Sequence, residues 1–114
     1  MTAAELDALD RECAEWMGWT KVTRLTAFSV GMPPSEKPLT RIPSPTRDWT
    51  AFGELLLALG ERGFYPSVHL SRMGDEREGA IRVKDGKHSL AKEREDDPRV
   101  ALCMAVAALG KSGA

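Results

Sequence analysis

The segment of residues 93–111, EREDDPRVALCMAVAALGK, constrains the fold more than any other part of the chain. Asp97 followed by Pro98 predicts the start of a helix, because a short carboxylate accepts a backbone N–H and proline has no N–H to lose in the first turn. Every residue from 100 to 109 is apolar, and Gly110 is expected to end the helix. A helix that is apolar on nearly every face is buried on more than one side. We therefore expect this helix at the centre of the fold or at a subunit interface.

The length and charge of the chain indicate a single domain spanning residues 1–114, with an ordinary mixed surface. Apolar residues make up 42% and charged residues 29%, and the formal net charge is −1. This balance predicts a cytoplasmic protein and offers no global basic excess for a dedicated nucleic-acid binder. No apolar run reaches the roughly 20 residues of a membrane span, and the acidic N-terminal segment does not look like a secretion signal. Cys13 and Cys103 are expected as small buried thiols, with a disulfide as the alternative if the first and last helices touch.

The N-terminal half is predicted to contain one helix and one long irregular segment. Thr2 and Glu5 have the spacing of a capping box, and the helix is expected over residues 2–17, where Gly18 ends it. Residues 19–30 are ambiguous between a short strand and an extended segment. Residues 31–45 contain five prolines and are expected to form a loop, either functional or simply mobile.

The remainder, residues 46–110, is predicted to form an α-β-β-β-α unit. A helix begins at Thr46 or Asp48 and ends at Gly63. Strands are expected over residues 64–73, 80–84 and 87–92, joined by a polar turn at 74–79 and a type I′ turn at 85–86. The predicted fold is therefore α+β, with the order α-α-β-β-β-α. Its three-stranded antiparallel meander is covered by helices in a layered α/β/α sandwich.

From Asp48 onward this order resembles the double-stranded RNA-binding domain. That family needs basic residues at the N-terminus of its second helix, where they contact RNA phosphates. At that point this chain has Glu93, Glu95, Asp96 and Asp97, which repel phosphate. Nucleic-acid binding is thus an alternative that rests on topology alone, and we expect nucleic acid not to be the partner.

The whole chain is more similar to the phage ABA sandwich family, small proteins of phages and prophages. Three segments carry the resemblance: a helix ending in a Met-Gly-Trp element, a proline-containing approach to a Trp-bearing helix, and an Ala-rich apolar C-terminal helix. These are LDRECAEWMGW at 9–19, IPSPTRDW at 42–49 and PRVALCMAVAAL at 98–109. The resemblance implies a layered α/β/α fold and a phage-encoded accessory protein acting in the cytoplasm of a bacterial host.

No catalytic, metal or cofactor motif is found in the sequence. His69 and His88 fall in predicted strands without the spacing of a metal-binding motif, and we interpret them as surface or half-buried histidines. The serines lack the context of a nucleophile elbow, and no phosphate-binding loop is present. We therefore expect a protein that is not an enzyme and uses no cofactor.

Aromatic and arginine residues near the proline-rich segment are the candidate ligand-binding set. Helix-end aromatics can line a pocket for a planar ligand, and arginines can supply charge for a phosphate. The alternative is an aromatic core cluster that joins the first helix to the sheet. The candidates are Trp16, Trp19, Arg24, Arg41, Arg47, Trp49 and Tyr65.

These observations favour a non-enzymatic binding or interaction protein of phage origin. One form of that function is anti-defence, by sequestering a host nucleotide or masking a host protein. The alternatives are a nucleic-acid-binding module and a homo-oligomeric phage assembly protein. Self-association is expected because the last helix has more apolar surface than one small sheet covers.

Overall fold

The structure is a computed structural model that describes residues 2–26, 28–35, 38–70, 77–83, 89–95 and 97–111. The α+β class and the order of the predicted helices and meander strands are confirmed, and three short strands are added between the first two helices. In chain order the elements are α1 (Ala3–Trp16), β1 (Thr20–Arg24), β2 (Ser29–Met32), β3 (Thr40–Arg41), α2 (Trp49–Glu61), β4 (Phe64–Leu70), β5 (Arg77–Val83), β6 (Ser89–Glu95) and α3 (Pro98–Lys111).

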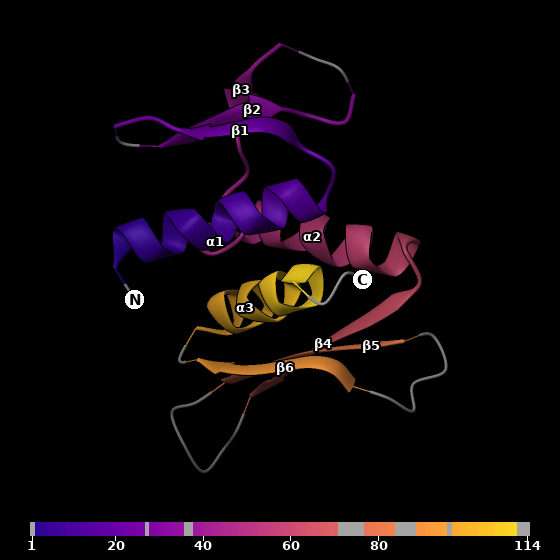
Figure 1. Cartoon of the computed structure of the whole chain (residues 1–114). Coiled ribbons are helices and arrows are strands. Elements are labelled where there is room, and N and C mark those ends of the chain that lie inside the picture. The colour runs from indigo at the N-terminus through magenta and orange to yellow at the C-terminus, as the bar shows by residue number, and fades with distance from the viewer. Residues whose placement is uncertain are drawn as a thin grey trace.

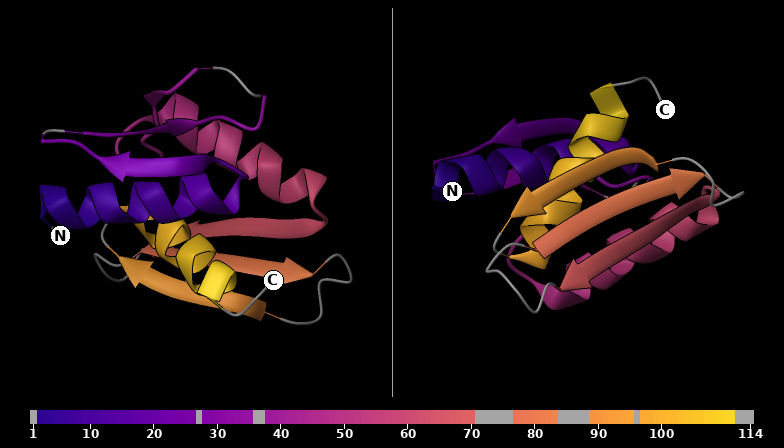
Figure 2. Two further views of the ribbon diagram at one scale, coloured as in Figure 1. Left: turned by 45° about the horizontal axis from the view of Figure 1, so that its top comes forward. Right: turned by 90° about the horizontal axis from the view of Figure 1, so that it is seen from below.

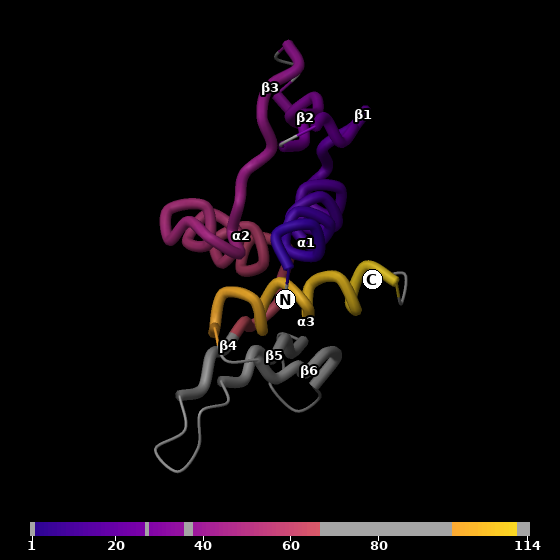
Figure 3. Tube along the Cα trace, turned by 90° about the vertical axis from the view of Figure 1, so that its left-hand side faces the viewer, coloured from indigo at the N-terminus to yellow at the C-terminus, as the bar shows by residue number. Residues whose placement is uncertain are grey.

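The helices lie between two three-stranded sheets, as Figure 1 shows. α3 packs directly on the meander of β4, β5 and β6, and α1 packs on α3 from the side away from that meander. The sheet of β1, β2 and β3 lies above α1, and α2 lies beside α1 (Figure 3). The described helices cover the meander from one face, which Figure 2 shows from below. The layers therefore run sheet, helices, sheet. The expected α/β/α layering, with helices on both faces of the meander, is wrong, because the described helices all lie on one face of the meander and the extra sheet of β1, β2 and β3 covers them from the other side.

α3 supplies the centre of the core, as its composition predicts. Leu102, Cys103, Ala105, Val106 and Leu109 have no exposed surface. The small side chains on this helix let α1 approach from one side while the meander covers the other. Because both apolar sides are covered within one chain, α3 itself needs no second subunit.

Helix ends follow the expected capping chemistry in all but one case. The capping box of Thr2 and Glu5 is formed, and the Asp48 side chain accepts from the backbone N–H of Thr50. Gly18 and Gly63, which follow α1 and α2, have φ of 99° and 85°, a conformation that costs glycine little. The expectation that Gly110 ends the last helix is wrong, because α3 continues to Lys111. The Trp16 ring lies 3.7 Å from where a Cβ at Gly110 would stand, which is an ordinary contact distance, so α1 packs close to this end of α3.

The proline-rich segment is not the continuous loop that was expected. β2 continues through residues 31 and 32, and β3 forms at residues 40 and 41. β1 pairs with β2 and β2 with β3, both antiparallel, so residues 20–41 hold a small sheet. Thr40 and Arg41 retain their backbone donors because no proline falls on them, which allows this pairing. The ambiguous stretch at 19–30 resolves into β1 and the start of β2.

The meander is confirmed, with boundaries that differ from the prediction. β5 begins at Arg77, inside the expected polar turn. β6 extends to Glu95, so Glu93 and Glu95 belong to a strand rather than to the entry of the last helix. The expected type I′ turn at 85–86 lies outside the described residues, as do residues 71–73, which were expected to continue the first meander strand.

The two cysteines meet where α1 packs on α3. Both are buried and free, and the Cys13 Sγ lies 3.8 Å from the Cys103 carbonyl oxygen. Contact with Cys103, together with burial, raises the pKa of the Cys13 thiol well above its ordinary value. They are therefore packing residues, and the alternative disulfide is not formed. None of the helices in the described part of the chain is long and apolar enough to cross a membrane.

Candidate functional site: a groove between the small sheet and α2

The seven residues predicted to bind a ligand do not form one pocket. Trp19 and Arg41 line a groove between the small sheet and α2, and Arg24 and Arg47 line a separate hollow beside the N-terminal half of α1. Trp16 lines a cleft between α1 and α3. The other two predicted residues, Trp49 and Tyr65, are exposed on α2 and β4.

The groove has a volume of about 390 Å³ and is the place where predicted aromatic and arginine residues meet. One wall comes from the segments around the small sheet and the other from α2. Its lining residues are Met17, Trp19, Pro34, Arg41 and Pro43 on the first wall and Glu54, Ala58, Glu61 and Arg62 on the second.

The turn after α1 delivers Trp19 to the groove. Gly18 adopts a left-handed conformation, and the Trp19 backbone N–H donates to the Ala14 carbonyl at 3.0 Å. The indole lies against Gly31, where an added Cβ would come within 3.3 Å of Trp19 Cε3. Glycine in β2 therefore makes room for the ring, which is held on one side by backbone.

Two guanidinium groups are positioned at the groove by aromatic rings. Arg41 Cζ lies 5.0 Å from the centre of the Phe28 ring, and Arg62 Cζ lies 4.3 Å from that of Trp16. Arg62 also donates a hydrogen bond to the Trp16 carbonyl. Neither arginine forms an ion pair with a carboxylate in the described residues. Both positive charges remain available to a ligand at the groove.

Sequence reasoning missed the second wall. Arg62 is a helix-end residue with no motif around it, and only the tertiary contact between the end of α1 and the end of α2 brings it beside Trp19. Glu54 and Glu61 repeat at helical spacing with Ala58, a pattern that indicates one face of α2 but not what this face meets.

One of the two arginines that line the hollow beside α1 has a structural role. Asp10 is buried and accepts hydrogen bonds from the Thr46 backbone N–H at 3.1 Å and from its hydroxyl at 3.0 Å. Arg47 Nη2 donates to the same carboxylate at 3.3 Å. Burial raises the pKa of Asp10, and the bonds from Thr46 and Arg47 partly offset this rise. Arg47 thus holds the segment before α2 against α1. The hollow has a volume of about 240 Å³, and Arg24 also lines it.

Trp49 marks a junction between the starts of α2 and α3. Arg99 Cζ lies 4.5 Å from the centre of the Trp49 ring, and Phe52 packs edge-on against it at 5.4 Å. Arg99 also donates to the Asp97 carboxylate at 2.9 Å, and this hydrogen bond lowers the pKa of Asp97. The arginine that the RNA-binding comparison would require at this helix start is therefore already matched by a carboxylate.

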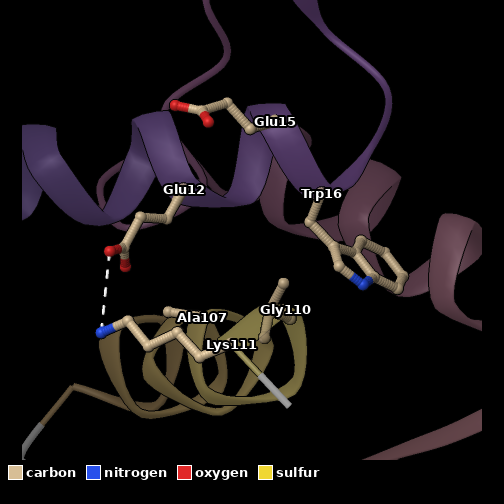
Figure 4. Close-up of a pocket in the computed structure, with 7 residues that line it drawn as sticks. Glu12, Glu15, Trp16, Ala107, Gly110 and Lys111 are labelled. Atoms are coloured by element: carbon tan, nitrogen blue, oxygen red, sulfur yellow. Dashed lines mark ion pairs between the residues drawn. The ribbon is translucent and has the colours of Figure 1, made fainter. Parts of the chain in front are cut away.

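A cleft of about 430 Å³ lies between the C-terminal halves of α1 and α3 (Figure 4). Glu12 and Glu15 stand on its α1 side, and Lys111 pairs with Glu12 at 3.8 Å. The Trp16 ring closes one end of the cleft and is shared with Arg62 and Phe64. Trp16 accordingly serves the packing of α1, as the core-cluster alternative proposed.

Within the described residues, no group of three or more His, Cys, Asp or Glu side chains is placed to hold a metal ion. His69 lies in β4 opposite Glu78 of β5, and His88 lies outside the described residues.

Comparisons with known proteins yield no relative. No protein-family model, no curated protein and no solved structure matches the chain. The geometry of the site is therefore the basis for a functional proposal.

Proposed function

We propose that the protein is a non-enzymatic binding protein that captures a small planar anionic ligand of the nucleotide class in the groove beside Trp19. The observation that carries this proposal is the convergence of Arg41 and Arg62, neither paired with a described carboxylate, on a groove that contains an exposed part of an indole ring. Two guanidinium groups suit the negative charge of a phosphate, and the indole suits stacking of a base.

The second wall adds a further requirement on the ligand. Glu54 and Glu61 line the same groove and lack an ion-pair partner among the described residues. A carboxylate only accepts hydrogen bonds, so it favours a ligand that offers N–H donors on its edge. A nucleobase with an exocyclic amino group meets this requirement, whereas inorganic phosphate alone does not.

Titration calorimetry of the full chain with mononucleotides and cyclic nucleotides tests the proposal. We expect a 1:1 complex whose affinity falls about tenfold or more in Arg41→Ala, since a hydrogen bond to a charged group contributes about 1.5–3 kcal/mol. Trp19→Leu is expected to weaken binding similarly by removing the stacking surface.

Arg24→Ala is the matched control, because Arg24 is an exposed arginine of the small sheet that does not line the groove. Absence of heat with every nucleotide, together with no co-purifying small molecule by mass spectrometry of the denatured protein, would remove the proposal. An equal loss in Arg24→Ala and Arg41→Ala would move the site away from the groove.

The biological setting is a separate part of the proposal. The resemblance to the phage ABA sandwich family supports a phage accessory protein in the host cytoplasm, where capture of a signal nucleotide would oppose a host defence. A gene neighbourhood rich in anti-defence genes would support this setting, and one made of structural genes would favour assembly instead.

A further inference from the structure

The guanidinium group of Arg62 is held at two points, unlike that of the other arginine in the groove. Arg62 donates a hydrogen bond to the Trp16 carbonyl, and its Cζ lies 4.3 Å from the centre of the Trp16 ring. Arg41 lies over the Phe28 ring at 5.0 Å but forms no hydrogen bond with the described residues. Because a guanidinium group is planar, a stack on one face and a bond from one edge together fix its orientation.

The Trp16 ring is itself restrained by two other parts of the chain. The centre of the Phe64 ring lies 6.2 Å from that of Trp16, and Trp16 Cδ1 lies 3.7 Å from where a Cβ at Gly110 would stand. The ring lines the cleft between α1 and α3 rather than the groove (Figure 4). A ligand in the groove can therefore contact Arg62 without touching the indole behind it.

We propose that Trp16 is a positioning residue for the groove, which keeps the Arg62 guanidinium group oriented to bind the phosphate of the ligand. This inference rests on the proposed nucleotide-binding function. An arginine side chain that is free in solution loses rotamer freedom when it binds a ligand, and one that is already held loses less. The Trp16 carbonyl takes one of the five N–H donors of Arg62, so the remaining donors can form paired bonds to phosphate oxygens.

A second arginine–tryptophan stack in the chain supplies a matched control. Arg99 Cζ lies 4.5 Å from the centre of the Trp49 ring, and neither of these residues lines the groove. Trp49→Leu therefore removes an indole from beside a guanidinium group without altering Arg62. Trp16→Phe is the conservative variant, because it keeps an aromatic face for the guanidinium group and leaves the backbone carbonyl unchanged.

NMR titrations of the full chain with adenosine and with adenosine monophosphate test the proposal. The ratio of the two dissociation constants measures how much the phosphate adds to binding. We expect Trp16→Leu to reduce this ratio about three- to tenfold, Trp16→Phe to reduce it less and Trp49→Leu to leave it unchanged. Adenosine should bind equally well to all of them, whereas a misfolded variant would lose both ligands. In an Arg62→Ala background, Trp16→Leu should have no further effect on the ratio.

The ligand-free protein gives a second measurement, because protons above an aromatic ring are shifted upfield by its ring current. The side-chain signals of Arg62 should be shifted in the wild type and in Trp16→Phe, and unshifted in Trp16→Leu. Unshifted Arg62 signals in the wild type, an unchanged ratio in Trp16→Leu or an equal loss in Trp49→Leu would overturn the role of Trp16. A wild type that binds neither probe would instead remove the proposed function, and the positioning role with it.

Discussion

Asp10 is the buried side chain that links α1 to the segment before α2. It is 1% exposed, and it joins α1 to the segment that leads into α2 through both donors of Thr46. We expect Asp10→Ala to lower the free energy of unfolding by about 1–3 kcal/mol, because it leaves a buried backbone N–H and a buried hydroxyl without an acceptor. Urea denaturation measures this loss. Arg47→Ala, which keeps both Thr46 bonds, should cost clearly less.

The same carboxyl group gives the effect of Asp10→Ala a pH dependence. The folded-state pKa of Asp10 is raised by burial, so its contribution to stability is fully present below the ordinary aspartate pKa. That contribution is lost as the pH rises through the raised value. The difference in unfolding free energy between wild type and Asp10→Ala should therefore narrow with rising pH in this window. A difference that widens would show that the hydrogen bonds outweigh burial.

At the scale of single elements, the glycines in and directly after α2 are of two kinds, which differ in whether φ is positive. Gly63 follows the helix with φ of 85° and has open space around it, so its role is conformational alone. Gly53 also has open space but no positive φ. We expect Gly63→Ala to destabilise the protein by about 1 kcal/mol and Gly53→Ala to stabilise it by about 0.5–1 kcal/mol. Thermal unfolding of dilute protein compares the two, and equal signs would contradict this reading of the backbone.

Elements with local signals were predictable from the sequence, and elements held together by distant partners were not. The capping box at Thr2 and the cap at Asp48 sit within three residues of the groups they satisfy, so spacing alone identifies both helices. β3 has only two residues and exists because β2 lies beside it. Five prolines in the surrounding segment indicate a loop by composition, and the strand pairing overrides that local preference.

Only part of the candidate site could be predicted from the sequence, because contacts between distant segments assemble the rest. Residue type predicts Trp19 and Arg41 as site residues, and they meet because β1 and β3 flank β2 in one small sheet. Arg62 is added by the packing of helix ends. The charge of Arg47 predicts a ligand contact, but its guanidinium group donates a hydrogen bond to buried Asp10 instead.

On the scale of the whole molecule, α3 connects the layers. α1 packs on one side of it and the meander on the other, so loss of volume in α3 should be felt by both. Leu102→Ala is expected to cost about 2–5 kcal/mol and to shift a single cooperative transition. Fluorescence and circular dichroism should move together. A variant in which the two probes separate would show that the small sheet and the meander unfold independently.

The packing of α1 on α3 also has a consequence for how the chain is made in the cell. Cys13 and Cys103, which touch in the core, are 90 positions apart in the sequence. During synthesis α1 and the small sheet leave the ribosome long before α3 exists. Their apolar faces therefore remain exposed to solvent until α3 has been made. The nascent chain is thus open to chaperones and proteases until its last helix emerges, and only then can the core close.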